Sequence, residues 1–325
     1  MKLKTKLFQT KYMPLLITFL LLLVLFIFGS VKYTGFFSLQ NFLNLLIDNA
    51  FLLITAIGMT FVLLTGGIDI SVGSMIAFTC MFSADLLRKG WHAAIVIALS
   101  LCIGCLFGAL MGVLITKFKI QPFIVTLAGM FMARGLCYVV SIDTIIIDNP
   151  FYVTMSQSRI PIGDGFISYS VVIAIVVLIA AFFILQFSKF GRTVYAIGGN
   201  EQSARLMGLQ VDSTKILVYT LNGGCSALAG IVFSFYMLSG YGLHTVGLEM
   251  DAIAAAVIGG TLLTGGVGYV MGTLLGVLTQ GTIQTLIMFQ GTLSSWWTKI
   301  AVAALLCLFI LIQRVFTLVK VKKLK

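Results

Sequence analysis

Long apolar runs alternate with short polar connections along almost the whole chain. A helix needs close to 20 apolar residues to cross a hydrocarbon core of about 30 Å. Marking such runs predicts ten transmembrane helices, the third and eighth of them short, at residues 14–29, 42–64, 70–85, 91–116, 122–141, 168–187, 214–239, 251–264, 268–289 and 295–316. The pattern therefore predicts an all-α polytopic membrane protein with a single transmembrane domain over residues 1–325.

Two glycine-rich frames interrupt this pattern. LLTGGIDISVGS begins at Leu63, and LLTGGVGYVMGT begins at Leu262. Glycine reaches positive φ and lets backbones approach closely, and an irregular segment at membrane depth must be buried in protein or line a water-filled cavity. We therefore expect two broken or re-entrant segments and an internal two-fold repeat, with halves at about 42–187 and 216–316. Whether the repeat is parallel or inverted is left open by the pattern.

Paired interrupted segments in two halves of a chain are typical of a translocation pathway. The pathway candidates are Thr65, Gly66, Gly67, Asp69, Ser71, Gly73, Thr264, Gly265, Gly266 and Gly272. Two simpler readings stay open. The glycines also suit close helix packing, and Asp69 is either an intramembrane functional acid or the cap of a helix that starts at Ile70.

Composition and charge support a membrane location. The chain has 60% hydrophobic and 10% charged residues, a mean hydropathy of +1.11 and a net charge of +11. Its lysines flank the apolar runs, which indicates cytoplasmic loops rather than nucleic-acid binding. This rule places both termini and residues 188–215 in the cytoplasm, and residues 141–168 outside as a small cap. Arg88 and Lys89, also placed outside, are the exception. The first helix is expected to remain uncleaved.

The remaining reactive residues give little sign of chemistry. Six cysteines lie within apolar runs and suit core packing, while His92 and His244 suit local polar contacts. Glu249 and Asp251 match the N-terminal dipole of the eighth helix. No metal site is indicated, and the acidic residues are too scattered for an intramembrane enzyme. A phosphate-binding G-x-x-x-x-G-K-[ST] loop is also missing, so energy must come from a partner or from an ion gradient.

The stretch GRTVYAIGGNEQSARLMGL lies in the predicted cytoplasmic segment. Asn200 can cap a short helix over residues 201–207, which Gly208 ends. Two helical turns are not stable alone, and this piece has a polar side and an apolar side that contains Ala204. It is therefore expected to dock against something. The plainer alternative is a loop helix that lies on its own membrane domain.

The two frames and this stretch resemble the permease subunits of bacterial ABC sugar importers of the ribose and xylose type. DNAFLLITAIGMTFVLLTGGIDISVGS and GTLSSWWTKI are similar to one of the permeases of the galactofuranose importer. The resemblance implies a multi-pass protein of the bacterial inner membrane, with a second permease, a cytoplasmic ATPase subunit and an extracytoplasmic sugar-binding protein as partners. ATP is then bound by the partner ATPase, with no cofactor on this chain. The implied ATPase-coupling residues are Gly198, Asn200, Glu201, Ala204, Arg205 and Gly208.

The sugar itself is not fixed by the sequence. Hydroxyl and amide groups suited to sugar contacts are Thr65, Ser71, Ser74, Thr264, Gln280 and Gln284. Galactofuranose is the expected substrate, with ribose, xylose or a similar small sugar as the alternative. An ion-coupled secondary transporter is a further alternative, although the chain offers little beyond Asp69 as a relay for ions or protons.

Overall fold

The computed structural model describes residues 13–294 and 296–322, most of which are helical. The elements in chain order are α1 (Met13–Lys32), α2 (Leu39–Asp48), α3 (Ala50–Leu64), α4 (Val72–Arg88), α5 (Ala93–Lys117), α6 (Pro122–Val140), β1 (Ile145–Ile146), α7 (Pro150–Gln157), β2 (Ile160–Ile162), β3 (Gly165–Ile167), α8 (Tyr169–Phe187), α9 (Lys189–Gly199), α10 (Glu201–Leu206), α11 (Val211–Met237), β4 (Ser239–Gly240), α12 (Leu248–Ile258), α13 (Val270–Gln290) and α14 (Trp296–Lys322).

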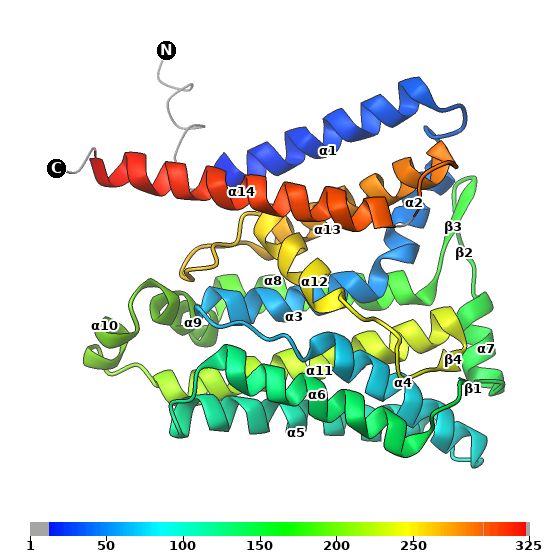
Figure 1. Ribbon diagram of the computed structural model, residues 1–325, viewed down its shortest axis with the longest axis horizontal. Helices are drawn as coiled ribbons and strands as arrows, with labels where there is room; N and C mark the ends of the chain where they lie inside the picture. The colour runs from blue at the N-terminus through cyan, green and yellow to red at the C-terminus, as the bar shows by residue number, and fades with distance from the viewer. Residues whose placement is uncertain (1–12, 295, 323–325) are drawn as a thin grey trace.

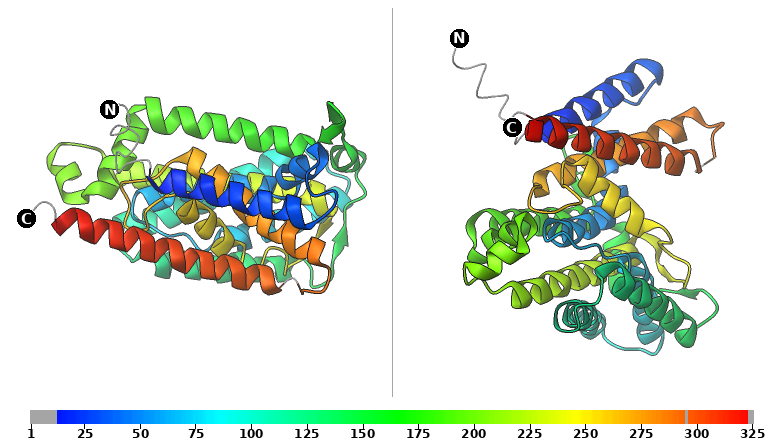
Figure 2. Two further views of the ribbon diagram at one scale, coloured as in Figure 1. Left: turned by 90° about the horizontal axis from the view of Figure 1, so that it is seen from above. Right: turned by 60° about the vertical axis from the view of Figure 1, so that its left-hand side comes forward.

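The long helices run roughly along one axis of the molecule (Figure 1). One end carries α9 and α10 and is called the connector end below. The other end carries β1 to β4 and α7 and is called the strand end. Helices α1, α13 and α14 lie on one side and α5 and α6 on the opposite side, an arrangement that two further views also show (Figure 2). Helix α1 starts, and α14 ends, toward the connector end.

Within the described residues, seven helices are long and apolar enough to cross a membrane, and the pair α2 and α3, bent by 55°, adds an eighth. Helices α4 and α12 lie where the short third and eighth helices were expected, but they do not meet that test of length and composition. A polytopic helical membrane protein is thus confirmed. The count of ten spans and the two-fold repeat stay predictions.

The centre of the fold is built from α3 and α12. Every residue of α3 except Phe51 is buried, and so are residues 252–258 of α12. A helix that is apolar on all sides belongs in a protein interior. The surrounding helices therefore separate these two from lipid.

Small residues let α5 and α11 pack closely against each other. A Cβ on Gly104 would lie 2.6 Å from the carbonyl oxygen of Gly223, and Gly108 and Gly112 press equally closely on Tyr219 and Ile216. Glycines spaced by four residues let two membrane helices approach to backbone contact. This stripe is a helix-packing motif that lies outside the two interrupted frames, while Gly272 of the second frame packs on Gly259 in a similar way.

The strand end is closed by two short antiparallel pairs. β1 pairs with β4, and β2 forms a hairpin with β3. Residues 141–168 therefore form a small folded unit, as expected, and β1 ties this unit to the end of α11.

Three expectations from the sequence were wrong in detail. The predicted helix 42–64 is broken at Asn49, and the predicted helix 251–264 ends at Ile258, because Gly259 and Gly260 follow it. Cys102 and Cys307 are exposed rather than core residues, although Cys80 and Cys137 are buried.

Candidate functional site

The first interrupted frame forms a non-helical segment between α3 and α4. Helix α3 ends at Leu64, and the Thr65 hydroxyl donates back to the carbonyl oxygen of Val62 at 2.8 Å. Gly66 has φ +77°, a conformation that glycine adopts readily. The chain resumes as a helix only at Val72. The break therefore lies where the glycines predict it.

Asp69 anchors this segment to α11. Its side chain is 2% exposed, and Oδ1 accepts from the backbone N–H of Ser71 at 2.9 Å and from the Ser71 hydroxyl at 2.6 Å. Oδ2 accepts from the amide nitrogen of Asn222 at 2.8 Å. The residue is therefore not a cap within the first turn of α4, because its backbone bond is to Ser71, the residue before the helix. It fixes the break to a neighbouring helix instead.

Gly67 is also held against α11. A Cβ at this position would lie 2.5 Å from the Tyr219 hydroxyl oxygen. That hydroxyl is buried and has no hydrogen-bond partner within the described part of the chain. Asn222 and Tyr219 were missed by the sequence analysis, although an asparagine inside an apolar run is the kind of signal that marks a buried polar contact.

The second interrupted frame is a tight loop over residues 259–269. Gly265 and Gly266 have φ values of +85° and +75°. The amide of Leu262 donates to the carbonyl oxygen of Val267 at 2.9 Å and closes the loop on itself, while Thr264 is exposed at its tip.

The two frames meet each other at the connector end. The amide of Gly266 donates to the carbonyl oxygen of Leu64 at 2.9 Å. A Cβ on Gly265 would lie 2.8 Å from the amide nitrogen of Gly66 and 3.0 Å from Cα of Gly198. Segments that are about 200 residues apart in the sequence are thus in backbone contact.

The end of α9 completes this contact. A Cβ on Gly198 would overlap both the carbonyl oxygen of Leu64 and the amide nitrogen of Gly266. From the same helix, the Tyr195 hydroxyl donates to the carbonyl oxygen of Gly268 at 2.9 Å. We call the meeting point of Gly66, Gly198, Gly199, Gly265 and Gly266 the glycine junction. It joins both breaks to the segment that leads into α10.

Not every candidate lies at the junction. Gly73, in the first turn of α4, faces Thr245, whose hydroxyl donates to its carbonyl oxygen at 2.7 Å. Gly272, in α13, packs against Gly259. Among the expected sugar contacts, Ser74 is fully buried, Gln280 donates to the carbonyl oxygen of Asp251 at 3.1 Å and Gln284 is exposed. The predicted pathway residues therefore lie in several places in the fold. The hydroxyl of Ser71 already donates a hydrogen bond to Asp69.

The short helix α10 forms as expected. Asn200 Oδ1 accepts from the backbone N–H of Ser203 at 2.8 Å, and Gly208, with φ +76°, follows the last turn. Ala204 is fully buried, whereas Leu206 and Met207 are 89% and 67% exposed. The expected apolar face is thus divided, because Ala204 packs inward and the other two side chains project outward.

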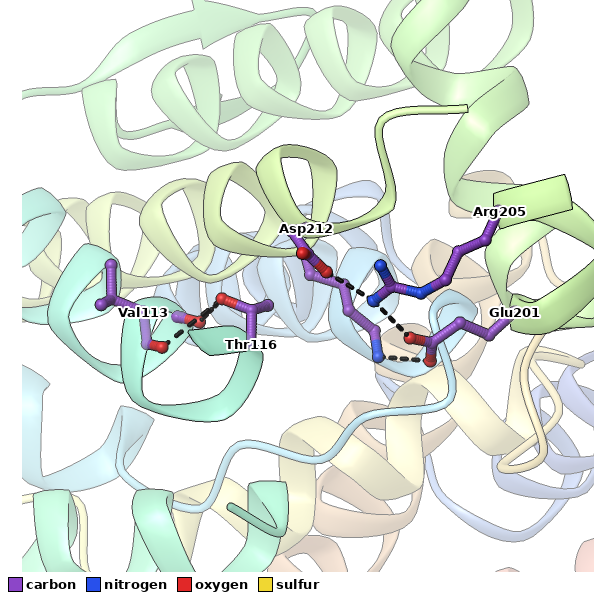
Figure 3. Close-up of polar contacts among 7 residues, drawn as sticks. Val113, Thr116, Glu201, Arg205 and Asp212 are labelled. Atoms are coloured by element: carbon purple, nitrogen blue, oxygen red, sulfur yellow. Dashed lines mark hydrogen bonds and ion pairs between the residues drawn. The ribbon is translucent and has the colours of Figure 1, made fainter. Parts of the chain in front are cut away.

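Four charged side chains hold α10 to the start of α11 (Figure 3). Arg205 binds Glu201 at 3.2 Å and Asp212 at 2.5 Å, and Lys215 binds the second oxygen of Glu201 at 2.6 Å. Partial burial opposes ionisation of Glu201, but the hydrogen bonds and charges of Lys215 and Arg205 outweigh it and lower the pKa of Glu201. The network fixes the orientation of α10 on the membrane domain.

Comparison with known proteins identifies the family of the chain. The family described as "Branched-chain amino acid transport system / permease component" matches residues 41–311. The inner membrane ABC transporter permease protein YjfF of Escherichia coli K12 is 51% identical over 308 residues, which cover 94% of this chain and 93% of that protein. No solved structure matches the chain.

Two more distant relatives carry the names of sugars. The fructose import permease protein FruG of Bifidobacterium longum is 37% identical and covers 93% of this chain and 90% of its own length. The ribose import permease protein RbsC of Escherichia coli K12 is 36% identical and covers 90% of this chain and 91% of its own length. These relatives confirm the expected resemblance to ABC sugar permeases of the ribose type, and the chain belongs to the family of permease components of the branched-chain amino acid transport system.

Proposed function

We propose that this chain is the membrane-spanning permease subunit of an ATP-driven sugar importer, and that it forms the translocation pathway with a second permease. The observation that carries the proposal is the glycine junction. Both interrupted frames touch each other and the end of α9 through backbone atoms at the glycine junction, and the Tyr195 hydroxyl adds a hydrogen bond from α9 to the second frame. A movement of α9 and α10 is therefore passed to both breaks through direct backbone contact.

The connector end is proposed to face the cytoplasm. Lys117 ends α5 and Lys119 follows it, while Lys189 begins α9 and Lys215 lies in the first turns of α11. Positive charge of this kind favours the cytoplasmic side. At the strand end Arg88 and Lys89 both pair with Asp85, at 3.0 Å and 2.6 Å, so one of their two positive charges is compensated there. With α4 and α12 counted as membrane segments, this orientation supports the ten-span arrangement with an internal repeat.

The tip of α10 is proposed to dock a cytoplasmic ATPase subunit. Leu206 and Met207 project from a helix that the charged network holds in place. Exposed apolar side chains on a short, fixed helix suit insertion into a groove of a partner protein. Because the sequence has no phosphate-binding loop, that partner supplies ATP hydrolysis, and an extracytoplasmic binding protein delivers the sugar at the strand end.

A monosaccharide is the proposed substrate. FruG and RbsC are named as fructose and ribose import permeases, and the motif resemblance favours galactofuranose. Uptake of radiolabelled galactofuranose, ribose, xylose, fructose and arabinose by the assembled importer in proteoliposomes tests this directly. We expect ATP-dependent uptake of one of these sugars above the others. ATP-independent uptake, or uptake of none of them, would refute the proposal.

The docking surface needs its own test. Leu206→Cys, in a chain cleared of its native cysteines, is expected to cross-link to a surface cysteine of the ATPase subunit. Ala204→Cys is a poor probe because that side chain is buried. Leu243→Cys is the matched control, since Leu243 is half-exposed but lies beyond β4, away from the connector end. Equal cross-linking from both positions, or none from Leu206, would show that α10 does not dock the ATPase.

A further inference from the structure

A group of ionisable side chains lies in the middle of the molecule, away from the glycine junction. Asp69 bonds to Asn222 near the middle of α11, and Gly73 follows four residues later at the start of α4. Gly73 meets both Thr245 and Glu249, the latter in the first turn of α12. The first turns of two short helices thus meet between the connector end and the strand end (Figure 1), and a carboxylate at membrane depth is costly without a partner.

One carboxylate oxygen of Glu249 has no partner. Oε2 is buried and makes no hydrogen bond within the described residues, and a Cβ on Gly73 would collide with it. The residue as a whole is partly exposed. No lysine or arginine of the described residues forms an ion pair with it, in contrast to Asp251 two residues later, which pairs with Lys299. A carboxylate with a purely structural role is normally satisfied by the protein around it.

The segment that leads into Glu249 is held under strain. Thr245 has φ +57°, which a β-branched residue rarely adopts. Arg134 of α6 fixes this segment by donating to the carbonyl oxygens of Gly242 and His244, at 2.6 Å and 2.8 Å. Strain of this kind persists where the surrounding structure imposes it, and it is concentrated at binding and switching sites.

Exposed apolar side chains flank the carboxylate. Val246 is 62% exposed and Met250 is 53% exposed, on either side of Glu249 in the sequence. A sugar presents hydroxyl groups at its edge and C–H groups on its face. A carboxylate accepts hydrogen bonds from neighbouring hydroxyls strongly, and apolar side chains contact the C–H face. The combination fits a neutral monosaccharide.

We propose that Glu249 accepts hydrogen bonds from the hydroxyls of the transported sugar in the middle of the pathway, with Val246 and Met250 against its C–H face. Arg134 is a positioning residue that holds the segment 241–247 around it. In the present structure Gly73 covers one oxygen of Glu249. Separation of the first turns of α4 and α12 frees that oxygen for the sugar. This inference rests on the proposed function and names the substrate-binding residue within it.

The first test compares Glu249→Gln with Asp164→Asn in the complete importer with its binding protein. Asp164 is exposed in the turn between β2 and β3 and undergoes the same chemical change. Loss of a charge-assisted hydrogen bond to the sugar is expected to lower uptake by Glu249→Gln about tenfold or more. ATP hydrolysis stimulated by the sugar-loaded binding protein is measured in the same preparation, so that uptake is compared per ATP hydrolysed. Asp164→Asn should match wild type in both measurements.

The second test measures occupancy and does not require a change at Glu249. Val246→Cys in a cysteine-cleared chain is labelled from outside by a membrane-impermeant thiol reagent during ATP turnover. Labelling is expected to be slower with sugar-loaded than with sugar-free binding protein, whereas Ile146→Cys, exposed in β1, should react equally in both. If Glu249→Gln does not insert into the membrane, the labelling of Val246→Cys by itself tests the inference.

Two results would overturn the inference. One is sugar uptake by Glu249→Gln at the wild-type rate. The other is labelling of Val246→Cys at the same rate with sugar-loaded and with sugar-free binding protein. Absence of sugar uptake by the wild-type importer is a different outcome, because it refutes the proposed function itself.

Discussion

Replacement of Gly198 by alanine is the sharpest test of the glycine junction, because Gly199 provides a control one residue away. Both glycines end α9, and both changes add one methyl group. At Gly199 nothing lies within 4 Å of the added carbon, whereas at Gly198 that carbon would overlap the carbonyl oxygen of Leu64 and the amide nitrogen of Gly266. The pair therefore separates close approach from every general effect of replacing glycine.

The expected cost follows from the contacts at Gly198. Alanine favours a helix over glycine by about 1 kcal/mol, and both variants share this gain. The methyl group at Gly198 enters the hydrogen bond of 2.9 Å between Gly266 and Leu64, whose loss costs about 1 kcal/mol. Overpacking against backbone that cannot turn away adds roughly 1–3 kcal/mol. Gly198→Ala is therefore expected to destabilise the glycine junction by about 2–4 kcal/mol relative to Gly199→Ala. This corresponds to a factor of about 30 or more in the equilibrium constant for forming the junction.

The assay is sugar uptake and ATP hydrolysis by the assembled importer in proteoliposomes. Gly199→Ala should transport at close to the wild-type rate. Gly198→Ala should insert and bind the ATPase subunit, since α10 is unchanged, but its uptake per ATP hydrolysed should fall to about a tenth or less. Equal uptake by the two alanine variants would refute the reasoning, because it would mean that the three segments do not have to touch during transport.

Three further predictions concern single contacts. Asp69→Asn should keep most of the sugar uptake, because the side-chain amide of Asn222 can turn its unpartnered oxygen toward the new amide group. Asp69→Ala should lose most of the uptake, because it leaves buried hydrogen-bond donors without an acceptor at about 1–3 kcal/mol each. Equal uptake by the two variants would contradict this role of Asp69. Gly67→Ala should impair uptake through contact with the Tyr219 hydroxyl, and Tyr219→Phe in the same chain should restore it, which uptake by the double variant checks. Because the pKa of Glu201 is lowered, its stabilising contribution is complete above the ordinary carboxyl pKa and is lost as pH falls through the lowered value. Thermal unfolding of the purified protein between about pH 5 and pH 3 should therefore show a fall in stability that is smaller in Glu201→Gln, and the difference should be slight because Glu201 is 39% exposed.

The sequence predicted the positions of the breaks because their cause is local. Gly66 adopts a positive φ, as do Gly265 and Gly266, and an apolar run that meets such residues has to leave the helix. The cap at Asn200 and the end of α10 at Gly208 follow from the same kind of local chemistry. These features need no knowledge of the rest of the fold.

The residues that the two breaks contact could not be predicted from the sequence. The contact of Gly266 with Leu64, and of both with Gly198, depends on how three distant segments pack. The role of Asp69 was undecided for the same reason, since its partner Asn222 lies more than 150 residues away. In the sequence, Glu249 matches an ordinary acidic residue at a helix N-terminus, and only the structure shows Gly73 beside its buried oxygen.

The enclosure of α12 and α4 also bears on how the chain is inserted during synthesis. Residues 252–258 are all buried, and most of α4 faces protein, much of it α11. Neither helix qualifies as a span by length and composition. Helix α12 has 11 residues, and α4, with 17, is at the lower limit of the length that spans a bilayer, so α4 is held only weakly in lipid on its own. Helix α4 is made more than 100 residues before α11. Until α11 arrives, α4 is expected to remain at the membrane surface or inside the insertion machinery, and a chain that stops at residue 210 should leave it accessible to water-soluble reagents.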